Sequence, residues 1–185
     1  GMVDVPEDLA WRLMSGGLSM LRVFTYLRKH QAANPQGELL KLNAVKAASD
    51  LGCQPAAVRE NVEKLVRRGW IGRDGRKLFH RSWKSVLKKE RMWSGKLKMC
   101  RLPATYLGSM TAFRGILMAH LCAVKVCQQQ DVRSRHKTRM NSDGPRQDGG
   151  ALSLNAVMET LGVSKGRASR LRGMAMDIGA VHIDY

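Results

Sequence analysis

Apolar residues recur at helical spacing in two segments, one in each half of the chain. The first set is Met20, Val23, Phe24 and Leu27. The second set is Phe113, Ile116, Leu117, Leu121 and Val124. Because residues three and four positions apart share one face of a helix, each set predicts a helix with one buried face.

A short sequence follows each of these segments almost unchanged. Residues 40–45 read Leu-Lys-Leu-Asn-Ala-Val and residues 152–157 read Leu-Ser-Leu-Asn-Ala-Val, a match at five of six positions. After a gap of two residues, the pair Leu51-Gly52 is matched by Leu161-Gly162. We interpret the chain as two copies of one unit.

The repeated residues also predict where a second helix begins and ends in each copy. Asn43 and Asn155 stand immediately before Ala-Val, where a side-chain oxygen can accept from the first free amides of a helix. Gly52 and Gly162 would end these helices, because glycine adopts the left-handed conformation without steric cost. A turn of three or four residues would follow.

A third helix is predicted after each turn. In the first copy it would open with Pro55 and run to Gly69. In the second copy it would follow Ser164 as N-cap and run to Gly179. Its spacing predicts buried side chains at Val58, Val62, Leu65 and Val66 in the first copy, and at Ala168, Leu171, Ala175 and Ile178 in the second.

Beyond Gly69 the pattern changes from helical to extended. Asp74-Gly75 separates two short extended segments, which is a strong hairpin signal because type I′ turns need positive φ. The second copy ends at residues 181–185, with room for one strand and no return. The sequence therefore predicts a hairpin with a basic tip in the first copy and a truncated one in the second.

These elements predict a mainly α protein with a small β-hairpin wing, built from two tandem units joined by a basic linker. We expect an N-terminal segment at 1–17, a first domain at 18–80, a linker at 81–108 and a second domain at 109–185. A polar insertion at 128–150 interrupts the second domain. It is either an arm that orders on DNA or a tolerated loop.

The order of three helices, a Leu-Gly turn, and Gly-Trp-Ile before a basic hairpin resembles winged helix-turn-helix domains. Residues 162–171, Gly-Val-Ser-Lys-Gly-Arg-Ala-Ser-Arg-Leu, are similar to the turn and recognition helix of many bacterial repressors. The resemblance implies binding of double-stranded DNA, with the third helix in the major groove. The tandem arrangement is also similar to that of plasmid and phage replication initiators.

The resemblance also implies which side chains would meet DNA. Lys165 and Arg167 would read bases, and Ser169, Arg170 and Arg172 would lie nearer the backbone. The first copy has Pro55, Ala56 and Ala57 at its helix start, which departs from the usual polar readers. The candidates there are Gln54 and Arg59 for hydrogen bonds, with Arg73, Arg76 and Lys77 of the wing mainly for phosphates. Further candidates for DNA contact are Lys64 and, in the linker, Lys84 and Lys88.

The charge distribution favours a polyanionic partner. The chain has 32 Lys and Arg against 15 Asp and Glu, a net charge of +17, and residues 73–101 hold 11 of the cations and only two acids. Two alternatives stay open: a basic face that serves solubility, and a protein-docking module built on helix-turn-helix units. In the docking interpretation Phe113, Leu117, Leu121 and Val124 could form a homodimer contact.

Trp83 and Trp93, interleaved with lysines in the linker, either stack on bases or dock the linker onto a domain. We expect no enzyme activity, cofactor or metal, because no catalytic or nucleotide-binding motif occurs. The longest apolar run, 112–127, includes Arg114, His120 and Lys125, so we expect no membrane span. The acidic start and scattered cysteines predict a cytoplasmic protein.

Overall fold

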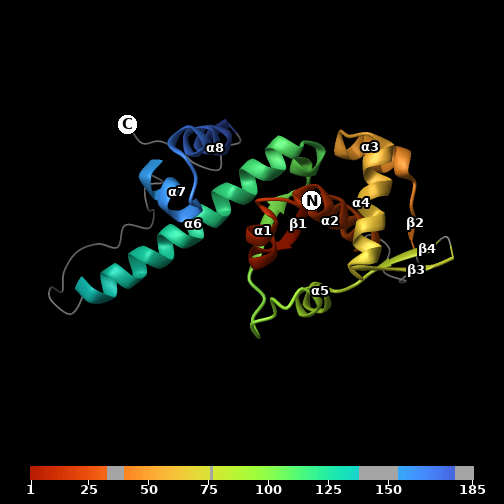
Figure 1. The fold of residues 1–185 in the computed structure, drawn as a ribbon, viewed down its shortest axis with the longest axis horizontal. Helices are drawn as coiled ribbons and strands as arrows, with labels where there is room; N and C mark the ends of the chain where they lie inside the picture. Colours follow the sequence, from red (N-terminus) through yellow and green to blue (C-terminus); the bar gives the residue numbers. More distant parts are fainter. Residues whose placement is uncertain (33–39, 76, 138–153, 178–185) are drawn as a thin grey trace. The chain divides into compact units, whose positions relative to one another are not determined.

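The computed structural model describes residues 1–32, 40–75, 77–137 and 154–177 (Figure 1). The chain divides into two compact units, Gly1–Arg114 and Gly115–Tyr185. The described residues are mainly helical, with two small antiparallel sheets, which confirms the predicted balance of helix and strand.

Three helices form the centre of the first unit: α2 (Leu18–Ala32), α3 (Ala44–Leu51) and α4 (Pro55–Arg67). The predicted apolar face of α2 is confirmed, since Met20, Val23, Phe24 and Leu27 are all buried. Phe24 packs edge-on against Trp70 and Trp83, with ring centroids 5.3 and 5.0 Å away. Aromatic pairs of this geometry contribute about 1 kcal/mol beyond the area they bury.

A three-stranded antiparallel sheet packs against α2 and α4. Its strands are β2 (Leu40–Lys41), β3 (Ile71–Asp74) and β4 (Lys77–His80), in the order β2-β4-β3 (Figure 1). The predicted hairpin is confirmed, with Asp74 paired to Lys77, so the turn lies one residue later than expected. Gly75 has φ +55°, the positive value that such a turn requires.

The second sheet joins the two ends of the first unit. Strand β1 (Met2–Pro6) pairs antiparallel with β5 (Met99–Pro103), and the buried side chains alternate along both strands. Helix α1 (Glu7–Leu13) follows β1, and the short 3₁₀ helix η1 (Ala104–Gly108) follows β5. Residues 1–17 and 81–108, which we had expected to be a terminal segment and a linker, therefore lie within the first compact unit.

Helix α5 (Trp83–Lys89) forms where the sequence predicted a short basic helix. Ser82 caps it by accepting a hydrogen bond from the Ser85 amide at 3.2 Å. Trp83, Val86 and Leu87 are buried, as their spacing predicted.

Helix α6 (Met110–Lys137) spans the division between the units, and α7 (Leu154–Leu161) and α8 (Lys165–Asp177) complete the second unit. Its described core consists of Cys122, Val157 and Ala168, with Leu154, Met158 and Val163 packed against them. Because α6 continues to Lys137, the expectation of a loop from residue 128 was wrong for its first ten residues. No glycine or proline interrupts 116–143, and the Gln, Arg and Lys residues there favour helix. The rest of that insertion and the predicted truncated hairpin lie outside the described residues.

The two helix–turn–helix segments have turns of the same length. A three-residue turn separates α3 from α4, and another separates α7 from α8. The first residue of each turn is a left-handed glycine, Gly52 at φ +58° and Gly162 at φ +60°. Both glycines therefore end their helices as predicted.

The two predicted helix starts differ in outcome. Asn43 caps α3, its side-chain oxygen accepting from the Lys46 amide at 3.0 Å. Asn155 lies inside α7, which begins one residue earlier at Leu154, so its prediction as N-cap was wrong. The hydrophobic Leu154 joins the core cluster, which favours its inclusion in the helix.

Candidate nucleic-acid interface

Helix α4 presents a polar face beside its buried one. Pro55 occupies the first turn, where its missing N–H costs nothing. Val58, Val62 and Leu65 are buried as predicted, whereas Val66, which was also predicted to be buried, is half-buried. Gln54 precedes the helix, and Arg59 and Lys64 extend from it; all three are exposed, as the sequence predicted. The burial of the apolar stripe fixes which way these polar side chains face.

Two of the cations predicted to meet phosphates form ion pairs with acids of α4. Lys64 Nζ lies 2.6 Å from Glu60 Oε1, and Arg73 Nη2 donates to Glu63 Oε1 at 2.5 Å. The Lys64 contact holds the pKa of Glu60 below its ordinary value by hydrogen bonding and charge. A phosphate reaching Arg73 would have to compete with Glu63, a partner that sequence reasoning missed.

Arg59 and Arg73 come together at a groove between α4 and the hairpin. This groove has a volume of about 380 Å³, and Leu42, Val62, Gly75 and Leu78 provide most of its remaining wall. Glu63 also lines it. The structure thus gathers two predicted cations and one acid at the same place.

Helix α5 supplies two more of the predicted cations, Lys84 and Lys88, both exposed. Lys84 Nζ lies 5.5 Å from the centroid of the Trp93 ring, and Arg28 Cζ lies 4.9 Å from that of Trp83. Trp83 is only 6% exposed and packs on Phe24. The docking role is therefore confirmed for Trp83, because a buried ring cannot stack on a base.

Helix α8 exposes the predicted cations of the second unit. Ala168 and Leu171 face the core, and Lys165, Arg167, Ser169 and Arg170 are exposed, whereas Arg172 is half-buried. Within the described ranges, none of these four cations forms an ion pair. Arg76 and the side chain of Lys77 lie outside the described residues.

The apolar residues suggested for a homodimer contact do not form a free surface. Phe113, Leu117 and Leu121 are buried within the single chain and Val124 is half-buried, which corrects that expectation. Burial within the chain therefore accounts for the helical spacing of these apolar residues.

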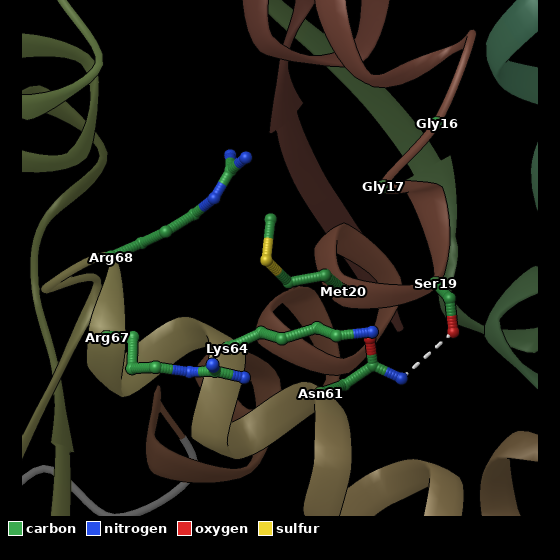
Figure 2. A pocket seen from close by; sticks show the side chains of 8 residues that line it. All are labelled: Gly16, Gly17, Ser19, Met20, Asn61, Lys64, Arg67 and Arg68. Atoms are coloured by element: carbon green, nitrogen blue, oxygen red, sulfur yellow. Dashed lines mark hydrogen bonds between the residues drawn. The ribbon is translucent and has the colours of Figure 1, made fainter.

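A larger pocket, which was not among the predicted sites, lies at the C-terminal half of α4. It has a volume of about 560 Å³ (Figure 2). Gly16, Gly17, Ser19 and Met20 line one side, and Asn61, Lys64, Arg67 and Arg68 line the other. Of its three cations, only Lys64 was among the predicted site residues. The spacing of 64, 67 and 68 along one helix face could have indicated the cluster.

Neither a metal site nor a membrane-spanning helix is found among the described residues. Across the described residues, no three His, Cys, Asp or Glu side chains gather where they could hold a metal ion. In the same ranges, no helix combines the length and the apolar character needed to cross a membrane.

Comparisons with models of protein families, with curated proteins and with solved structures found no match to this chain.

Proposed function

We propose that this protein binds double-stranded DNA through two helix-turn-helix units, the first of them winged. One observation carries the proposal: in both units two helices are joined by a three-residue turn that opens with a left-handed glycine. In helix-turn-helix proteins the second helix of such a pair enters the major groove. The three-stranded sheet with its hairpin beside α4 supports the winged character of the first unit.

Helix α8 is the principal reader of sequence in this proposal. Lys165 and Arg167 are exposed at its first turn, and long cations there can reach guanine edges. Helix α4 instead begins with Pro55, Ala56 and Ala57, whose side chains cannot hydrogen-bond a base. The first unit would therefore position the protein on the backbone more than it reads bases, with Gln54 and Arg59 as its polar contacts.

The charge excess supports the same proposal. A net charge of +17 favours association with phosphates, and protein interfaces are generally depleted of lysine at their centres. The biological role would be that of a cytoplasmic transcription regulator or replication-associated factor without enzymatic activity.

A salt titration with a mixed-sequence duplex of about 30 base pairs tests this proposal. If about eight phosphates are neutralised, log affinity should fall against log salt with a slope of roughly −7. The double variant Lys84→Ala/Lys88→Ala, which removes two exposed cations assigned to phosphates, should have a shallower slope. The matched control is Arg101→Ala, because Arg101 lies on β5 and is 74% exposed beside Asp4. A slope near zero for the unaltered protein would reject DNA binding.

Light scattering with and without DNA separates this proposal from the protein-docking alternative. A salt-independent protein complex, with no affinity for duplex, would support docking instead.

A further inference from the structure

The pocket at the C-terminal half of α4 has walls of one charge. Lys64, Arg67 and Arg68 are the three ionisable residues in its lining, and no acidic side chain lines it. Figure 2 shows the side chains of Lys64 and Arg67 extending from α4 and that of Arg68 from the residue after its end, with Met20 and Ser19 of α2 across from them. Met20 is buried, so the pocket has an apolar floor beneath its cations.

The two walls are held together by a buried polar side chain. Asn61 is 7% exposed, and its Nδ2 donates to Ser19 Oγ at 3.1 Å and to the Ala57 carbonyl at 2.8 Å. The first bond joins α4 to α2 directly beside the cations. The pocket is therefore formed by the fold, with no need for a ligand to assemble it.

The cations of the pocket differ in how far acids neutralise them. Lys64 contacts Glu60 on its own helix at 2.6 Å, and Arg68 Nη1 lies 3.6 Å from Glu90 Oε1, which also accepts from Trp70 Nε1 at 2.8 Å. Arg67 is exposed, and no ion pair joins it to another described residue. The lining thus keeps a net positive charge with at least one guanidinium available.

We propose that this pocket binds a phosphate group. Guanidinium groups match phosphate oxygens with paired hydrogen bonds, and a lysine adds a mobile point charge. A volume of about 560 Å³ lies within the usual range of small-ligand sites and exceeds what a single inorganic ion fills. The phosphate belongs either to a small phosphorylated molecule or to a DNA strand. Binding of a phosphate from a DNA strand rests on the proposed function.

Calorimetry with pyrophosphate at constant ionic strength tests the small-molecule source. The test variant is Lys64→Gln/Arg67→Gln, which leaves the Arg68–Glu90 contact in place. Losing two charge-assisted contacts should weaken pyrophosphate binding at least tenfold. The matched control is Arg101→Gln, which changes an exposed arginine of β5 outside this pocket and should leave the pyrophosphate affinity within about twofold. The charge-preserving variant Lys64→Arg/Arg67→Lys should restore binding.

A duplex without terminal phosphates tests the second source. If a backbone phosphate occupies the pocket, the double variant should make the salt slope shallower by about one, the contribution of one phosphate. Arg101→Gln, on β5, should leave the slope unchanged. Circular dichroism melting of each variant confirms that the fold is retained.

The pyrophosphate and duplex measurements distinguish the phosphate pocket from the proposed DNA binding. A tenfold loss of pyrophosphate binding, or a slope change of about one, in the double variant alone supports the phosphate pocket. If pyrophosphate binds and duplex does not, the pocket stands and DNA binding falls. If the double variant matches the unaltered protein in both arms, or if neither probe binds, the pocket proposal is overturned.

Discussion

The two helix–turn–helix segments share a three-residue turn and its left-handed glycine, but the surroundings of the two turns differ. A Cβ added at Gly52 would lie 2.5 Å from the carbonyl oxygen of Gly108, whereas one added at Gly162 meets no atom of the described residues within 4 Å. The local sequence therefore determines the turn in both units. Only the first turn is also required by tertiary packing.

The third helices differ in charge. Helix α4 carries three cations and two acids, and both acids are paired with cations, whereas α8 carries four cations and one acid. The same scaffold thus presents a largely neutralised helix in one unit and a strongly basic one in the other. The difference supports unequal roles in binding a polyanion.

The glycine comparison leads to the largest expected effect. Gly52→Ala should cost about 3 kcal/mol, because left-handed strain of about 1 kcal/mol adds to a clash with rigid backbone. Gly162→Ala should cost only the strain, about 1 kcal/mol. Urea unfolding monitored by hydrogen exchange in α3–α4 and in α7–α8 measures each cost in its own unit. Equal costs would show that the Gly108 contact contributes nothing.

The charge comparison leads to the second prediction. Arg167→Ala should relax sequence preference in selection from random duplex DNA, by about 2 kcal/mol at one base position. Lys88→Ala, which removes an exposed cation of α5, should weaken binding to all sequences about equally. Equal loss of preference in both variants would contradict the division between reading and positioning.

Features set by neighbouring residues could be predicted from the sequence. The Asn43 cap, the left-handed Gly52, the Pro55 start and the hairpin each depend on a few consecutive residues with strong backbone preferences. The buried faces of α2, α4 and α5 followed from periodicity alone.

Features set by distant partners could not be predicted. The pairing of β1 with β5 joins residues almost a hundred positions apart, and β2 pairs with β4, so that Leu40 meets the distant Leu78. The Arg73–Glu63 pair depends on how β3 passes α4. For the same reason the sequence could identify exposed cations but could not separate paired ones from those that remain available.

A third prediction concerns the cores. The first unit buries Arg22 at 4% exposure, and none of the described residues forms a hydrogen bond with its Nε or Nη1, whereas the described core cluster of the second unit is apolar. Burial lowers the pKa of Arg22, a shift that the nearby Cys53 partly opposes. Arg22→Met should stabilise the first unit by about 1 kcal/mol, because it removes unsatisfied polar groups at similar volume.

Denaturant unfolding of Arg22→Met beside Arg22→Lys measures this effect. The lysine variant keeps the buried charge and should gain no stability. If the methionine variant were instead destabilised by more than 1 kcal/mol, the guanidinium would have a structural role that its contacts do not reveal.

The smallest expected effect is a dependence on pH confined to the first unit. Burial lowers the pKa of His80, and the positive charge of Arg28 lowers it further. Arg28 Nη1 donates to His80 Nδ1 at 3.2 Å, which requires a neutral ring. Burial likewise lowers the pKa of His30. For both histidines the pKa in the folded protein lies below the unfolded value of about 6.5. Their contribution to the free energy of unfolding is therefore fully present above a pH of about 6.5 and is lost as the pH falls through the pKa of the folded protein.

Hydrogen exchange at pH 7.5 and pH 5.5, corrected for intrinsic rates, checks this contrast. Amides of α2 and β4 should lose protection at the lower pH, and those of α7 and α8, which contain no histidine, should change less. His80→Gln should reduce the loss in the first unit, because glutamine gains no charge. If α7 and α8 lost protection to the same extent, the acid sensitivity would come from groups common to both units, and the half-buried His30 and His80 would not be its source.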